Sequence, residues 1–190
     1  YFCLRVVDAS QQAPFGSARV LVLDHLLHGI NHEQEPGMLI SPYVHLMQEL
    51  ICRHHHDKSH LEAFFIGGGA YTQPRALWLG HRSSNIIVAE LDPLVTEVAK
   101  QELFLDDRDM RVIHGDARTI LRRQDPLQRY DVIVGDAFHD VSVPYHLVTA
   151  EFAALLKQRL HDDGVYVMNL VDVFPNGRFA AAMLKTLGSQ

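Results

Sequence analysis

The sequence predicts an α/β domain built on a doubly wound, mostly parallel sheet. From residue 61 onward, short apolar runs typical of strands alternate with segments that carry the apolar spacing of helices. These runs are apolar almost throughout, which indicates that both faces of the sheet are covered. Three glycines, Gly67, Gly68 and Gly69, separate the first run from the helical pattern after it. We therefore predict a Rossmann-like domain, and 190 residues with 47% hydrophobic content suit one packed unit.

Residues 1–41 are expected to form a separate N-terminal segment of strands and loop. Two apolar stretches, YFCLRVVD and ARVLVLDHLLHG, flank the turn-rich joint ASQQAPFGS, so we predict a short β-hairpin appendage there. Residues 31–41 have no clear period and are predicted to be a loop. The Rossmann-like domain is predicted over residues 42–190. It begins with a helix over PYVHLMQELICRHHH, in which Pro42 lies near the first turn.

The strand and helix alternation of the main domain can be assigned element by element. Asp92 is a candidate N-cap and Pro93 a first helical residue, so a helix is predicted to start between them. The expected strands are EAFFIG, NIIVAELD, MRVIHGD, YDVIVGDAF and GVYVMNLV, and the expected helices cover residues 73–80, 93–104, 117–124, 149–160 and the stretch from 177 onward. The last helical pattern stops where such a sheet usually continues, and residue 1 is Tyr, so we expect a C-terminally truncated piece of a longer protein.

Composition excludes several classes of function. The formal net charge is −6 and no basic block occurs, which argues against nucleic acid as a partner. No apolar run approaches the roughly 20 residues that span a bilayer, and no signal peptide is predicted. We therefore expect a cytoplasmic chain without direct membrane contact. The segment CRHHHDKSH has no second half-site at zinc spacing, so it is interpreted as a solvated polar loop and no metal is predicted.

Acidic residues follow the glycine loop at the ends of successive predicted strands. Glycines after a strand allow a ligand to approach backbone N–H groups closely. Glu90 ends the next strand, about 20 residues on, where an acid can accept hydrogen bonds from a ribose diol. Asp116 ends the strand after that, where a carboxylate can accept from the exocyclic amine of adenine. Either acid could instead be a solvated strand end or a helix cap. Together they predict a nucleoside site at the carboxyl edge of the sheet.

Four segments resemble a known family. They are IGGGAYTQPRALW, VAELDPLVTEVAK, VIHGDAR and YDVIVGDAFHDVSVPYHLVTAEFAALLKQRLHDDGVYVMNL. They are similar to the spermidine synthase-like proteins, or polyamine aminopropyltransferases, which are relatives of the class I S-adenosylmethionine-dependent methyltransferases. The similarity covers roughly residues 18–175, and LDHLLHG with SPYVHLM resembles the family's substrate-side gate. The likeness is greatest to the bacterial branch that is often fused to membrane transporter domains.

The resemblance implies a co-substrate, either S-adenosylmethionine or decarboxylated S-adenosylmethionine. It assigns Gly67, Gly68, Gly69 and position 70 to the ligand loop, Glu90 to the ribose, Asp116 and the adjoining Ala117 to the adenine side, and His28 to a ligand-side position where the family has Gln. The family's loop reads G-G-G-D-G-G, and its acid contacts the aminopropyl amine. Because Ala70 stands in place of that acid, we expect weak discrimination between the two sulfonium ligands. Ala70→Asp should then favour the decarboxylated one.

The resemblance also implies residues for catalysis and for a small-molecule amine acceptor. Asp136 matches the acid that deprotonates or orients the attacking amine. Tyr43 matches a family Tyr, but the Glu two residues on is His45 here. The second acid of D-S-S-D-P falls on His139, and the adjacent Asp140 is displaced by one residue. Tyr145 lies on the loop that follows. These replacements of acids by His argue against putrescine or spermidine as the acceptor.

Three functions stay open from the sequence. The first is alkyl transfer, such as aminopropyl transfer, from an S-adenosyl sulfonium to an amine. The second is methyl transfer on the same scaffold, and the third is a non-catalytic nucleoside-binding domain of a larger membrane protein. Members of the family commonly pair, so the resemblance implies a homodimer.

Overall fold

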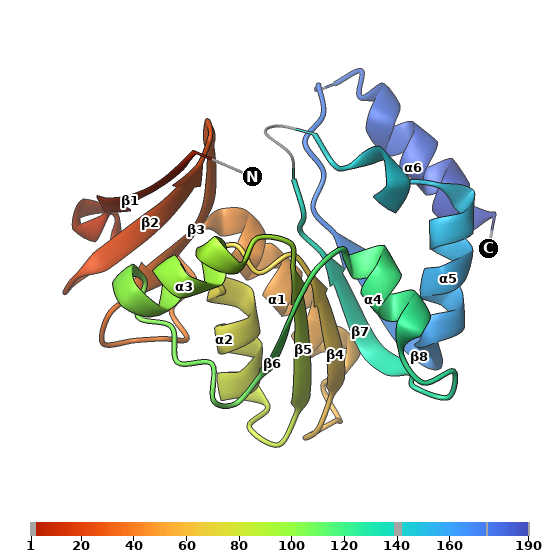
Figure 1. The fold of residues 1–190 in the computed structure, drawn as a ribbon, viewed down its shortest axis with the longest axis horizontal. Helices are drawn as coiled ribbons and strands as arrows, with labels where there is room; N and C mark the ends of the chain where they lie inside the picture. Colours follow the sequence, from red (N-terminus) through yellow and green to blue (C-terminus); the bar gives the residue numbers. More distant parts are fainter. Residues whose placement is uncertain (1–2, 139–141, 174, 190) are drawn as a thin grey trace.

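The computed structural model describes residues 3–138, 142–173 and 175–189, and within these it contains two sheets (Figure 1). The smaller sheet is antiparallel, in the order β1-β2-β3. The larger sheet has five parallel strands in the order β6-β5-β4-β7-β8. Strand order reverses between β4 and β7, and ligands of open α/β sheets bind at the carboxyl ends of the strands beside such a switch point.

The order of elements from residue 42 onward follows the prediction, but two bounds differ: β8 begins at Leu160, ahead of the predicted strand at residues 164–171, and β3 extends to His32, into the predicted loop. The small sheet comprises β1 (Leu4–Asp8), β2 (Ala18–Leu23) and β3 (Leu26–His32). The main sheet comprises β4 (Glu62–Ile66), β5 (Asn85–Glu90), β6 (Arg111–His114), β7 (Tyr130–Gly135) and β8 (Leu160–Met168). The helices are α1 (Pro42–His54), α2 (Thr72–Gly80), α3 (Pro93–Glu102), α4 (Ala117–Arg123), α5 (Ala150–Arg159) and α6 (Arg178–Gly188).

The central strand β4 shows why the sheet is covered on both faces. Its residues Ala63 and Phe65 belong to one buried cluster, which includes side chains of α1, α2 and α3. The alternate residues Phe64 and Ile66 belong to a second cluster with side chains of α4 and α5. Figure 1 shows the two groups of helices on opposite sides of the sheet. The prediction of a doubly wound parallel sheet is confirmed.

The N-terminal appendage differs from the expected hairpin because it contains a third strand. The stretch ARVLVLDHLLHG forms both β2 and β3, in which Leu23 pairs with Leu26 across a two-residue turn. Asp24 adopts a left-handed conformation in that turn, with φ of 52°. Asp tolerates this region better than most residues, but Asp-His is a weak hairpin signal compared with Asp-Gly. The sequence analysis therefore assigned residues 18–29 to one strand and did not predict the turn at Asp24 and His25.

The small sheet packs against the main domain and reaches its glycine loop. Leu21 and Leu23 of β2 join the main core, whereas Val20 and Val22 lie in a separate small cluster. Asn31 of β3 donates from Nδ2 to the carbonyl oxygen of Ala70 at 2.7 Å. The segment predicted as an appendage is thus connected directly to the loop that precedes α2.

Two other predictions can be compared with the fold. Asp92 caps α3, since its side chain accepts from the backbone N–H of Leu94 at 3.0 Å. In the histidine-rich segment, however, His55 is buried rather than solvated, and its Nε2 meets the carbonyl oxygen of Asp131 at 3.0 Å. Within the described ranges, no three His, Cys, Asp or Glu side chains are grouped to hold a metal. Nor does any helix there have the length and hydropathy to cross a bilayer.

Candidate ligand-binding and catalytic site

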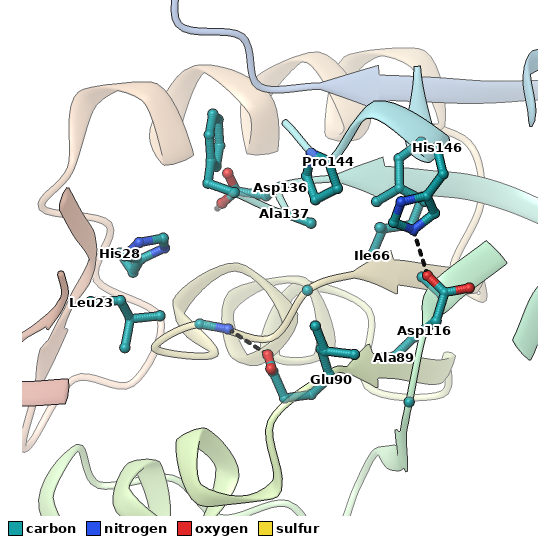
Figure 2. A pocket seen from close by; sticks show the side chains of 17 residues that line it. Leu23, His28, Ile66, Ala89, Glu90, Asp116, Asp136, Ala137, Pro144 and His146 are labelled. Carbon is teal, nitrogen blue, oxygen red and sulfur yellow. Dashed lines mark hydrogen bonds and ion pairs between the residues drawn. The ribbon is translucent and has the colours of Figure 1, made fainter. Parts of the chain in front are cut away.

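A cleft lies at the carboxyl ends of the central strands, next to the switch point. The space around the cleft that no protein atom fills is about 600 Å³, counted together with the solvent at its open side. Gly67 after β4, Glu90 at the end of β5, Asp116 after β6 and Asp136 after β7 all line it. Figure 2 shows His28 facing this cleft from β3, on the side where Asp136 lies. Residues distant in sequence therefore meet because their strands end at one edge.

Gly67 is the position of the loop where the backbone requires glycine. Its φ is +92°, and a Cβ there would lie 2.7 Å from the carbonyl oxygen of Asp136. A side chain is strained at this φ, and the close approach of the Asp136 carbonyl leaves no room for one. The loop after β4 and the loop after β7 are thus held together backbone against backbone, at the mouth of the cleft.

Glu90 is bound to the glycine loop itself. Its Oε2 accepts from the N–H groups of Gly68 at 2.8 Å and Gly69 at 3.3 Å, and its Oε1 accepts from the N–H of Asp92 at 2.9 Å. The side chain is buried, and burial raises the pKa of Glu90 despite these hydrogen bonds. Glu90 therefore fixes the loop conformation, and its role toward a ribose stays a prediction.

Asp116 combines the helix cap with a contact across the cleft. Its Oδ1 accepts from the N–H of Thr119 at 2.8 Å and caps α4, and its Oδ2 lies 2.7 Å from Nε2 of His146 (Figure 2). Burial acts to raise the pKa of Asp116, but the hydrogen bonds from Thr119 and His146 lower it overall. Ala117, the first residue of α4, lines the cleft beside it. The carboxylate is therefore ionised and oriented toward the cleft.

Asp136 is held by two neutral donors. Tyr43 of α1 donates its hydroxyl to Oδ2 at 3.4 Å, and Asn169 after β8 donates from Nδ2 to Oδ1 at 2.9 Å. Burial raises the pKa of Asp136, and no cation offsets this among the causes of the shift. Burial and the nearby Asp136 also raise the pKa of Tyr43, so the hydroxyl keeps its proton. A carboxyl group with an elevated pKa in a cleft is suited to accept and release a proton.

Two further hollows open from the region of Asp136. The first, here called the arm hollow, is lined by His28, Tyr43, Gly67, Gly68, Thr72, Gln73, Pro74 and Asp136, together with Val44 and Phe65. The second, here called the outer hollow, lies toward the small sheet. Its exposed wall is mainly apolar, from side chains such as Leu26, Leu27, Ile30, Ile40, Phe138 and Val171, and polar residues that include Gln12, His25, Ser41 and Asn169 also line it. His28 lines the cleft and both hollows. Burial lowers the pKa of His28 to about 4, so this imidazole is neutral at neutral pH.

Some predicted site residues lie elsewhere. Ala70 is fully buried and is not among the residues that line the cleft, and a Cβ added at Gly29 would lie 3.0 Å from its Cβ. Tyr145 is 84% exposed, and its neighbours Pro144 and His146 line the cleft instead. The predicted residues His139 and Asp140 fall outside the described part of the chain.

The sequence analysis did not select three residues that line these spaces: His146 in the cleft, Asn169 in the outer hollow and Gln73 in the arm hollow. Asn169 follows strand β8, so the rule that selected the acids after β5, β6 and β7 also applies to it. His146 adjoins the chosen Tyr145, and only the backbone of the short 3₁₀ turn Tyr145–Leu147 decides which of the two faces inward. Nothing in the sequence marks Gln73, because its significance depends on burial.

Comparison with known proteins identifies relatives. The sequence pattern of the family described as "Spermine/spermidine synthase domain" matches residues 45–189. The chain is 37% identical over 106 residues to the "Polyamine aminopropyltransferase" of Vibrio vulnificus, an alignment that covers 55% of this chain and 36% of the relative. It is 39% identical over 111 residues to the "N-terminal histidine N-methyltransferase" of Emericella nidulans, covering 56% of this chain and 19% of the relative.

A solved structure has a similar fold. The crystal structure of a probable spermidine synthase from Corynebacterium glutamicum superposes with a TM-score of 0.86 at 22% identity, over 100% of this chain and 67% of that chain. The alignments span 36% of the Vibrio vulnificus relative and 19% of the Emericella nidulans relative. The sequence likeness to these two relatives therefore concerns one portion of longer proteins.

Proposed function

The chain belongs to the spermine/spermidine synthase domain family, and on that premise we propose that it transfers an aminopropyl group from an adenosyl sulfonium to an amine. The co-substrate of this reaction would be decarboxylated S-adenosylmethionine, whereas S-adenosylmethionine is the co-substrate of the alternative reaction, methyl transfer. The observation that carries the proposal is the position of Asp136, a carboxyl group with an elevated pKa where the cleft meets both hollows.

The cleft suits the nucleoside half of such a ligand. Gly67 permits close approach of a ligand to the backbone, and apolar residues such as Ile66, Ala89 and Leu147 line the walls. Asp116 is an ionised acceptor at one end, where it can take a hydrogen bond from an exocyclic amine. Glu90 lies beside the loop, where a ribose hydroxyl could reach its carboxylate. These features support an adenosyl ligand lying across the carboxyl ends of β4, β5 and β6.

The proposed reaction needs little beyond alignment and removal of one proton. The acceptor nitrogen attacks the aminopropyl carbon bound to sulfur, so a C–N bond forms as the C–S bond breaks. The C–S electron pair goes to sulfur and gives neutral methylthioadenosine. Asp136 accepts the proton that leaves the nitrogen, while Tyr43 and Asn169 hold its two oxygens in place. The expected product is a secondary amine with one added aminopropyl group.

The outer hollow indicates the kind of acceptor amine. Among the described residues that line it, Asp136 is the only carboxylate, and the remaining walls are largely apolar. A long polyamine would need several acids to offset its charges when removed from water. We therefore propose an acceptor with one amine near Asp136 and an apolar body, in agreement with the loss of family acids at His45 and His139.

Methyl transfer is the second candidate, and the similarity to the N-terminal histidine N-methyltransferase favours it. The two reactions leave different nucleosides. Mass spectrometry of incubations with each sulfonium ligand and a panel of amines would detect methylthioadenosine after aminopropyl transfer or S-adenosylhomocysteine after methyl transfer. Formation of methylthioadenosine that requires both the amine and Asp136 supports the proposal. Binding of the nucleoside without either product would instead favour the third alternative, a non-catalytic domain.

A further inference from the structure

Gln73 is a buried amide in the arm hollow, and no hydrogen-bond partner for it lies among the described residues. It is the second residue of α2 and only 5% exposed, and neither its Oε1 nor its Nε2 is paired within the described structure. Neighbouring polar groups of the same hollow are satisfied, since Thr72 donates to Oδ1 of Asn31 at 2.8 Å and Tyr43 donates to Asp136. Buried amides are nearly always paired in folded proteins, so an unpaired one calls for a physical explanation.

The arm hollow adjoins the proposed nucleoside cleft. Gly67, His28 and Asp136 line both spaces. A ligand with its adenosine in the cleft and its sulfur near Gly67 would therefore direct the remaining substituent toward Gln73. In both candidate sulfonium ligands that substituent ends in an ammonium group, and in S-adenosylmethionine it also carries a carboxylate. A side-chain amide offers one acceptor and two donors, so it can bond to either group.

We propose that Gln73 recognises the polar end of the sulfonium ligand's arm, an inference that rests on the proposed function. Its Oε1 accepts from the ammonium group, and its Nε2 donates to the carboxylate when one is present. Because the amide is neutral, it distinguishes the two ligands by hydrogen bonding rather than by charge. This assigns arm recognition to position 73 in place of position 70, whose side chain packs against Gly29 outside the cleft.

The test compares three ligands in binding calorimetry: decarboxylated S-adenosylmethionine, S-adenosylmethionine and methylthioadenosine, which lacks the polar arm. Gln73→Met keeps the length of the side chain but removes the amide. We expect it to weaken both arm-bearing ligands by about threefold to tenfold, the usual value of one hydrogen bond, and to leave methylthioadenosine within about twofold. Gln73→Glu should shift the preference toward the decarboxylated ligand by at least about tenfold, since an acid attracts the ammonium and repels the carboxylate.

Gln48→Met is the matched control. Gln48 also has an unpaired Oε1, but it lies on α1 and lines neither the cleft nor the arm hollow. Its replacement should leave all three affinities unchanged. The ligand-free Gln73→Met protein should melt at the wild-type temperature or above it, because the change removes two unsatisfied polar atoms.

The possible results separate the inference from the proposed function. If wild-type protein does not bind methylthioadenosine, the proposed function fails and the inference fails with it. If methylthioadenosine binds but the arm-bearing ligands bind equally well to wild type and both Gln73 variants, only the inference is wrong. Equal weakening of all three ligands, or a lower melting temperature for Gln73→Met, would mean that Gln73 supports the fold and not the ligand.

Discussion

Glu90→Gln tests whether the acid at the end of β5 holds the glycine loop. The carboxylate accepts in two directions, toward Gly68 and Gly69 with one oxygen and toward Asp92 with the other. A Gln side chain has a single oxygen, and its NH₂ group takes the place of the other carboxylate oxygen. At least one of the buried backbone N–H groups therefore faces this NH₂ group and loses its acceptor. That loss costs roughly 1–3 kcal/mol, and release of the buried charge offsets part of it. We expect a net destabilisation of about 1–2 kcal/mol.

For a chain of 190 residues, this corresponds to a melting temperature lower by about 2–8 °C, measured by calorimetry at pH 7. Glu97→Gln on the exposed face of α3 is the control and should change the melting temperature very little. Affinity for methylthioadenosine should also fall at least about tenfold in Glu90→Gln, because the loop and a proposed ribose contact are altered together. A variant as stable as wild type, with unchanged affinity, would refute both roles.

The pH dependence gives a second check on Glu90. Burial raises the pKa of this side chain above its ordinary value of 4.5, so the folded chain holds the proton more tightly than the unfolded chain. The stability of wild type relative to Glu90→Gln should therefore fall as the pH rises from about 4.5 through the raised pKa, and stay level above it. A difference that grows with pH in this window would contradict the assignment.

Four other predictions concern the site and the assembly. Gly67→Ala should destabilise the chain by about 2 kcal/mol or more in a melting experiment, because φ is +92° and the new Cβ would lie 2.7 Å from the carbonyl oxygen of Asp136. Gly80→Ala is the control and should be nearly neutral, because its Cβ would meet no atom within 4 Å. Asp136→Asn should abolish transfer but keep methylthioadenosine binding. The pKa of Asp136 is raised above its ordinary value of 3.8, so the wild-type transfer rate should rise with pH as this carboxyl group ionises. Transfer that persists in the variant would exclude Asp136 as the base. His146→Leu removes the partner of Asp116 and should weaken methylthioadenosine about threefold to tenfold in calorimetry, whereas His54→Leu, at the end of α1, should not. Sedimentation at high micromolar concentration should give twice the 21.5 kDa monomer mass if the predicted homodimer forms, and the monomer mass would count against it.

Much of the site could be predicted from the sequence because parallel strands end at one edge. An apolar run followed by Glu90, Asp116 or Asp136 predicts both a buried strand and the edge at which its last side chain lies. Those three residues meet around one cleft, as expected. Their partners could not be predicted, since hydrogen bonds such as those of Tyr43 and Asn169 with Asp136 join segments distant in the chain.

Local backbone conformation explains why Ala70, which was predicted to line the site, does not line the cleft while Gln73 lines the arm hollow. The loop after β4 contains left-handed residues at Gly69 and Tyr71, with φ of 51° and 59°. Tyr71 is not a residue type that marks this conformation. The two left-handed residues flank Ala70, whose side chain packs against Gly29 outside the cleft. The first turn of α2 then places Gln73 at the arm hollow.

The sequence by itself determined the order of strands and helices, the doubly wound sheet and the acids at its carboxyl edge, because these depend on short-range periodicity and on the common direction of parallel strands. Only the tertiary structure decided which side chains face the cleft and the two hollows beside it. Burial and pairing are properties of the packed chain, so the unpaired amide of Gln73, the His146 contact with Asp116 and the third strand of the small sheet could not be inferred from residue type or spacing.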